Sequence, residues 1–195
     1  TASEERTTPV RVALFHVEES DSDASRGLSE TIQRFPSCTC QLVSPADVQQ
    51  RALERFDVVV FPGGRARRQA EALSERGKTA VRQFVREGGG YVGICAGAFL
   101  ATSGFDWSLA LVNAKTLTGT RDLPGHGTVS MSSRGSGTLN IELTPAGKTT
   151  LGDSPGPMDV SYTSGPIFSP ARRYDLPPYL ILARFRSEIW QYEPQ

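Results

Sequence analysis

The chain has 195 residues, enough for one domain with a sizeable core, and its 21 Lys and Arg residues balance 21 Asp and Glu residues. A net charge of zero gives no support to nucleic-acid binding or to binding at a membrane surface, and no apolar run reaches the roughly 18 residues of a membrane helix. Residues 1–9 are polar and are expected to be a disordered lead-in to a single domain over residues 10–195. A soluble protein is expected, and its compartment stays open between the cytoplasm and export after removal of a signal peptide.

Strand and helix patterns alternate in the first half. Apolar runs such as Val-Arg-Val-Ala-Leu-Phe are typical of buried parallel strands. The segment Ser44-Pro45-Ala46-Asp47 has the cap, proline and acid of a helix start. The expected strands are residues 10–16, 38–43, 57–61 and 91–94, and the expected helices are residues 23–35, 44–55, 65–75 and 78–87. Such units predict a flavodoxin-like, doubly wound α/β fold, a mostly parallel sheet with helices on both faces.

The second half is rich in Gly, Ser, Thr and Pro and is expected to be a β-rich C-terminal elaboration. We expect residues 127–131 and 138–143 to form a hairpin, with further strands at 158–162 and 179–185. Three cysteines are too few for a disulfide scaffold. Cys38 and Cys40 alternate on one strand, so they are packing residues, a pair of metal ligands or a strained disulfide. We expect packing, no metal and no cofactor.

The segment Gly93-Ile94-Cys95-Ala96-Gly97 has the form G-x-C-x-G, which is typical of a nucleophile elbow, a sharp turn from strand to helix with the reactive atom at its apex. A Cβ at position 93 or 97 is expected to collide with the neighbouring strand or helix. At the start of a helix, Cys95 is favoured as thiolate. Pro62-Gly63-Gly64 ends another strand, and the carboxyl ends of parallel strands meet at one edge, where ligands bind.

The sequence resembles the class I glutamine amidotransferase-like superfamily and, within it, the biotin-protein ligase N-terminal-domain-like group. The stretches that carry this resemblance are residues 59–64, 84–98, 111–115, 141–145 and 162–166. The resemblance implies that Cys95 is the nucleophile and that the backbone amides of Gly63, Gly64 and Ala96 hold an oxyanion. It also places Tyr162 near the ligand pocket.

Active members of the superfamily carry a His-x-Glu motif near the C-terminus, and this chain has none there. His16 ends the first strand and is a candidate base, with a structural role as the alternative. Glu18 or Glu19 is a second candidate, because the related intracellular-protease-like and Parkinsonism-associated families place a glutamate from this region against the cysteine. A solvated loop acid is the alternative. His126, in a glycine-rich turn, is a third candidate base.

Three basic residues, Arg65, Arg67 and Arg68, follow the Pro-Gly-Gly turn. They form either an anion-binding site or a solvated helix start. Three functions remain open for the chain. The first is a degenerate domain that binds a small polar or amide-containing ligand without turnover. The others are a cysteine-dependent amidase or hydrolase with a rearranged base, and a redox-sensing cysteine protein. A homo-oligomer is compatible with all three, and nucleic acid and membrane are not expected as partners.

Overall fold

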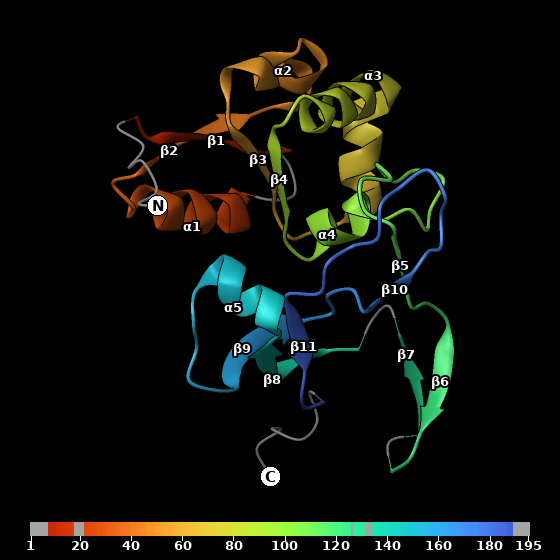
Figure 1. Ribbon diagram of the computed structural model, residues 1–195. Coiled ribbons are helices and arrows are strands. Elements are labelled where there is room, and N and C mark those ends of the chain that lie inside the picture. Colours follow the sequence, from red (N-terminus) through yellow and green to blue (C-terminus); the bar gives the residue numbers. More distant parts are fainter. Residues whose placement is uncertain (1–7, 18–21, 126, 132–133, 189–195) are drawn as a thin grey trace. The chain divides into compact units, whose positions relative to one another are not determined.

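The computed structural model describes residues 8–17, 22–125, 127–131 and 134–188 (Figure 1). Their contacts divide the chain after Leu111 into two compact units, and each is described by itself. The single domain expected from the sequence remains a prediction. No helix in the described ranges is both long and apolar enough to cross a membrane.

A parallel four-stranded sheet organises the first unit, with strand order β2-β1-β3-β4. Its strands are β1 (Val10–Phe15), β2 (Cys38–Val43), β3 (Val58–Phe61) and β4 (Gly90–Gly93). Its helices are α1 (Ser22–Gln33), α2 (Pro45–Gln49), the short 3₁₀ helix η1 (Ala52–Arg55), α3 (Ala66–Arg86) and α4 (Ala96–Ala101). The predicted fold class, a mostly parallel α/β sheet with helices, is confirmed.

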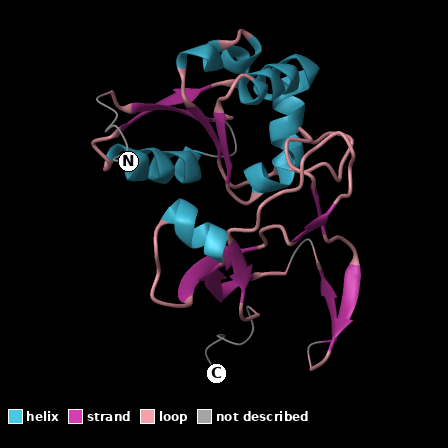
Figure 2. Ribbon diagram, in the orientation of Figure 1, coloured by secondary structure: helices cyan, strands magenta, loops and turns pink. Residues whose placement is uncertain are grey.

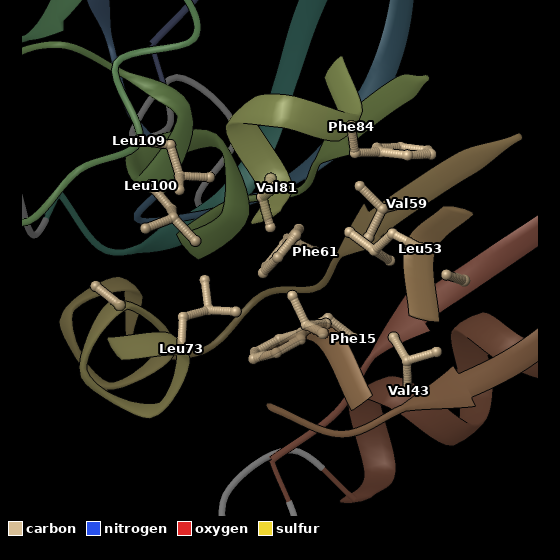
Figure 3. Packing of buried hydrophobic residues seen from close by; sticks show 13 residues of the cluster. Phe15, Val43, Leu53, Val59, Phe61, Leu73, Val81, Phe84, Leu100 and Leu109 are labelled. Carbon is tan, nitrogen blue, oxygen red and sulfur yellow. The ribbon is translucent and has the colours of Figure 1, made fainter. Parts of the chain in front are cut away.

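Each face of this sheet is covered by helices because successive strand residues point to opposite sides. Val12, Leu14 and Val60 pack with Leu28 and Ile32 of α1. The other face holds the larger cluster, in which the rings of Phe15 and Phe61 stack at 4.5 Å between centroids (Figure 3). The aromatic stack anchors β1 and β3 at the carboxyl edge of the sheet, where the predicted site residues follow.

One expected helix differs from the prediction. The expected helix 44–55 breaks at Arg51, whose φ of +66° is left-handed, so α2 is followed by the separate turn η1. The two helices expected over 65–75 and 78–87 are both present as the two halves of α3, which meet at a kink at Ser74 (φ 55°, ψ 179°). Val81 and Phe84 in the second half of α3 and Leu73 in the first are all buried in the same core.

Strands and loops dominate the second unit, as predicted (Figure 2). Its strands are β5 (Ala114–Thr116), β6 (Thr120–Leu123), β7 (Gly127–Ser130), β8 (Ser136–Leu143), β9 (Met158–Thr163), β10 (Phe168–Pro170) and β11 (Ala183–Phe185), and its helix is α5 (Pro145–Leu151). They form a sheet of order β11-β8-β9 and the pairs β10-β5 and β6-β7.

The predicted hairpin of residues 127–131 with 138–143 is wrong. β7 pairs with β6 instead, because Gly125, with φ +81°, permits a tight turn directly before β7. β8 lies between β9 and β11. The strand expected over 179–185 is shortened to β11, because the carbonyls of Ile181 and Leu182 accept hydrogen bonds from Thr144, the N-cap of α5.

Candidate functional site

Cys95 lies between β4 and α4 in a strained backbone conformation, with φ 50° and ψ −100°. Few L-residues adopt positive φ, and such strain persists only where the surrounding structure imposes it. Here the imposing contacts are backbone hydrogen bonds: Ile94 N–H donates to Phe61 O at 2.9 Å, and Gly97 N–H donates to Pro62 O at 3.3 Å. The end of β3 therefore holds both sides of the Cys95 turn.

The glycines on either side of Cys95 are required by close packing, as predicted. A Cβ at Gly93 would lie 2.5 Å from the carbonyl carbon of Gly97, and one at Gly97 would overlap the carbonyl oxygen of Phe61. Neither neighbour is a flexible side chain that can move aside, because both atoms belong to the backbone. The pattern G-x-C-x-G thus follows from the approach of α4 to β3 and β4.

Tyr91 of β4 stabilises the Cys95 turn through two contacts. Its ring stacks on Phe61 at 5.2 Å, and its hydroxyl donates a hydrogen bond to Gly97 O at 2.8 Å. Burial raises the pKa of the Tyr91 hydroxyl above its usual range, so this donor keeps its proton throughout the physiological pH range.

The turn Pro62-Gly63-Gly64 lies beside Cys95: a Cβ built on Gly63 would sit 3.7 Å from the Cβ of Cys95. Gly64 has φ +128°, a conformation that requires glycine. Among the described residues, none accepts a hydrogen bond from the backbone N–H of Gly63, Gly64 or Ala96. Their role as donors to a ligand stays a prediction.

Gln69 is a site residue that the sequence did not reveal. It is 1% exposed on α3, and its side-chain amide donates to Pro62 O at 3.0 Å, the same oxygen that accepts from Gly97 N–H. Its other side-chain atom, Oε1, is buried without a hydrogen-bond partner. The available signal was a polar residue one turn before Leu73 and next to Ala70, on the apolar stripe of the helix.

His16 directly follows β1, and its backbone N–H donates to the backbone oxygen of Val43 at 3.0 Å. Its side-chain Nδ1 is buried and has no hydrogen-bond partner. Strand β3 lies between β1 and β4 in the sheet, so His16 and Cys95 follow strands that are not neighbours. Glu18, Glu19 and His126 lie outside the described residues.

Tyr162 belongs to the second unit, on β9, and is 9% exposed. Its hydroxyl donates to Gly165 O at 2.7 Å. That hydrogen bond closes the Tyr-Thr-Ser-Gly turn, so the hydroxyl has a structural partner. A role of Tyr162 in ligand binding stays a prediction.

The remaining candidates are on the surface of the first unit. Arg67 forms an exposed ion pair with Glu71 at 3.1 Å, one turn along α3, and the anion site stays a prediction. Cys38 and Cys40 are free and partly buried on β2, and burial raises the pKa of the Cys40 thiol. No group of three metal-ligating side chains occurs within the described ranges.

Comparison with known proteins places these features in a family. The family model described as "Biotin-protein ligase, N terminal" matches residues 35–193. A glutamine amidotransferase from Thermotoga maritima is similar in structure, with TM-score 0.56 and 21% identity over 84% of this chain; the chain spans 64% of that protein. The structure of the protein SMU.1228c is also similar, with TM-score 0.53 and 17% identity. The match covers 95% of this chain and 70% of the SMU.1228c chain. No curated protein matches the sequence.

Proposed function

The chain belongs to the biotin-protein ligase N-terminal family, and from this premise we propose that it binds a small amide-containing ligand at the Cys95 turn, without the turnover of a classical amidotransferase. The observation that carries the proposal is the pairing of the strained Cys95 with the Pro62-Gly63-Gly64 turn, each at the end of a parallel strand. Open α/β sheets bind their ligands at this edge.

Backbone donors suit the carbonyl oxygen of an amide. The N–H groups of Gly63, Gly64 and Ala96 are fixed by the turns that contain them, so they need no reorganisation when a ligand arrives. Glycine at positions 63 and 64 lets the ligand approach the backbone closely. The Cys95 side chain then lies beside the carbonyl carbon of the ligand.

The proposal stops short of turnover because cleavage of an amide needs more than a thiol and backbone donors. A thiol next to an amide carbon needs a base to take its proton and an acid to protonate the leaving amine. A site made of the thiol and these backbone donors alone would hold the amide and would not cleave it.

The test is the alkylation of Cys95 by iodoacetamide at pH 7.5, followed by mass spectrometry in the presence and absence of glutamine, asparagine and simple primary amides. Cys38 and Cys40 are partly buried thiols in the same molecule and serve as internal references. We expect an amide to slow alkylation of Cys95 alone, with no release of ammonia. Equal rates with and without every amide would contradict the proposal.

A matched pair of glycine variants sharpens this test. Gly64→Ala strains the turn beside Cys95 (φ +128°) and is expected to abolish protection by the amide. Gly88→Ala imposes similar strain at φ +99°, at the end of α3 and with open space around the new Cβ, and should leave protection unchanged. Equal effects of the two variants would assign the loss to general destabilisation.

A cysteine-dependent amidase is the second candidate, and His16 favours it. The Nδ1 of His16 is buried without a hydrogen-bond partner, and the residues His16-Val17-Glu18 repeat the His-x-Glu spacing after β1. This function requires ammonia release that disappears both in Cys95→Ala and in His16→Gln. Release that survives either substitution would exclude it.

A further inference from the structure

A pocket of about 120 Å³ lies within the second unit, and this space is called the cavity below. Its lining is Leu139, Tyr162, Ile167 and Phe185 on the apolar side and Arg134, Ser187 and Glu188 on the polar side. The space is a pocket partly open to solvent, and small-molecule sites are typically concave, mostly apolar and lined by a few polar groups. An apolar space of this size is therefore a feature to explain.

The register of the β11-β8-β9 sheet creates the cavity. Leu139 lies opposite Val160, and Gly137 opposite Tyr162, so these residues share one face of the sheet. Gly137 has no side chain to fill the space beside the Tyr162 ring. Tyr162 and Phe185 meet edge to face at 6.1 Å and form a rigid aromatic corner.

The polar end of the cavity carries a buried cation. The Arg134 side chain is 6% exposed and is bonded through Nη2 to Oε2 of Glu188. A guanidinium taken out of water needs an anionic partner, since burial of an unpaired charge costs several kcal/mol. Glu188 provides that charge from a side chain that is 47% exposed. An exposed carboxylate returns to water at little cost.

We infer that this cavity is a binding site for a small carboxylate with a compact apolar body. The apolar body fills the space between Leu139 and the aromatic corner, and the carboxylate replaces that of Glu188 on Arg134. The planar fork of Arg134 suits two oxygens of one carboxylate. An engineered apolar cavity of roughly 150 Å³ holds benzene, so a single ring is at the upper limit of size here.

The inference does not rest on the proposed function, because every residue of the site belongs to the second unit. The probes are benzoate and isovalerate, with benzamide and isovaleramide as uncharged counterparts and acetate as a carboxylate without an apolar body. Binding is measured on the full chain by calorimetry and by NMR shifts of the Leu139 methyls and the Arg134 Nε–H. We expect each amide to bind at least about tenfold more weakly than its parent carboxylate, because it lacks the charge. Acetate should bind at least about tenfold more weakly than benzoate or isovalerate, because it lacks the apolar body.

Two substitutions must move affinity in opposite directions. Glu188→Gln removes the competing carboxylate and should tighten benzoate binding several-fold. Arg134→Gln removes the cation and should abolish it. If Arg134→Gln does not fold, Ile167→Trp fills the cavity while leaving Arg134 in place, and it should abolish binding as well.

Three results would overturn the inference. One is the absence of shifts at Leu139 and Arg134 in both the native chain and Glu188→Gln at the highest soluble benzoate concentration. Another is binding to folded Arg134→Gln or Ile167→Trp with native affinity. The third is equal affinity for benzoate and benzamide, which would remove the argument for a carboxylate.

Discussion

Gln69 shows how one buried side chain joins a helix to two turns. Its amide reaches Pro62 O, and that oxygen also accepts from Gly97 N–H, so α3, the Pro-Gly-Gly turn and the Cys95 turn share one acceptor. Burial of Gln69 Oε1 without a partner costs free energy that a purely structural residue would avoid. We therefore assign Gln69 as a positioning residue of the site.

Gln69→Leu separates this role from stability. Loss of the hydrogen bond costs about 1 kcal/mol, and removal of the unpartnered oxygen offsets part of it, so the free energy of unfolding changes little. Protection of Cys95 by an amide should nevertheless fall, because the Pro62 turn loses its support. Gln49→Leu is the control: Gln49 donates to the carbonyls of Ala72 and Leu73, away from the turn. Equal loss of protection in both variants would contradict the assignment.

Two glycines of the first unit respond oppositely to alanine. Gly97→Ala places a Cβ against the carbonyl of Phe61 and should lower the free energy of unfolding by about 1–3 kcal/mol. Gly27→Ala in α1 meets open space and should raise it by up to about 1 kcal/mol through better helix propensity. Urea unfolding of both variants measures the contrast, and a neutral Gly97→Ala would mean that α4 does not pack closely on β3 in solution.

At the scale of elements, α2 owes its start to a reciprocal cap. Asp47 N–H donates to Ser44 Oγ at 3.2 Å, and Ser44 N–H donates to Asp47 Oδ2 at 2.8 Å. The Ser44 hydroxyl also donates to this carboxylate, and it is the main reason that the pKa of Asp47 lies below its ordinary value. Because Val48 is buried in the core, the cap orients a helix that the sheet depends on.

The cap predicts a pH-dependent effect of Ser44→Ala. At neutral pH the variant should be less stable by about 1 kcal/mol. The pKa of the Asp47 carboxylate is lower in the folded chain than in the unfolded chain, where it is about 3.9. Above the unfolded-state pKa the carboxylate contributes its full stabilisation of the folded state, and this contribution is lost as the pH falls through the folded-state pKa. The difference between native chain and variant should thus shrink below about pH 4 in urea unfolding series. A difference that stays constant to pH 2 would show that Asp47 does not take part.

Over the whole molecule, the two units differ in the size of their cores. The first contains the cluster around Phe15 and Phe61, which Figure 3 shows. It also contains a second cluster around Leu14. Within the described part of the second unit, the cluster of buried residues comprises Leu139 and Tyr162, with Val160 packed against them. Burial of apolar area is the dominant favourable term in folding, so local stability should follow this difference.

Native-state hydrogen exchange tests that expectation. Backbone amides of β1 and β3 should exchange only through global unfolding, and those of β8 and β9 should open at a free energy lower by about 1 kcal/mol or more. Leu139→Ala should widen the gap, and Val59→Ala should lower the protection of β1 and β3. Identical opening free energies in both units would indicate that the two units unfold together as one cooperative unit.

The sequence by itself determined the parallel strands and the Cys95 turn, because apolar runs such as Val58–Phe61 and the glycines at 93 and 97 are local signals of burial and close approach. Strand pairing in the second unit needed the tertiary structure, since the partner of β8 is chosen by long-range contacts that no local pattern encodes. The same holds for the position of the break in α3, which lies at Ser74, whereas residue order alone placed it after Glu75. Only the tertiary structure brought Gln69 to Pro62 and Arg134 to Glu188, because such buried polar pairs depend on the distances between elements rather than on residue order.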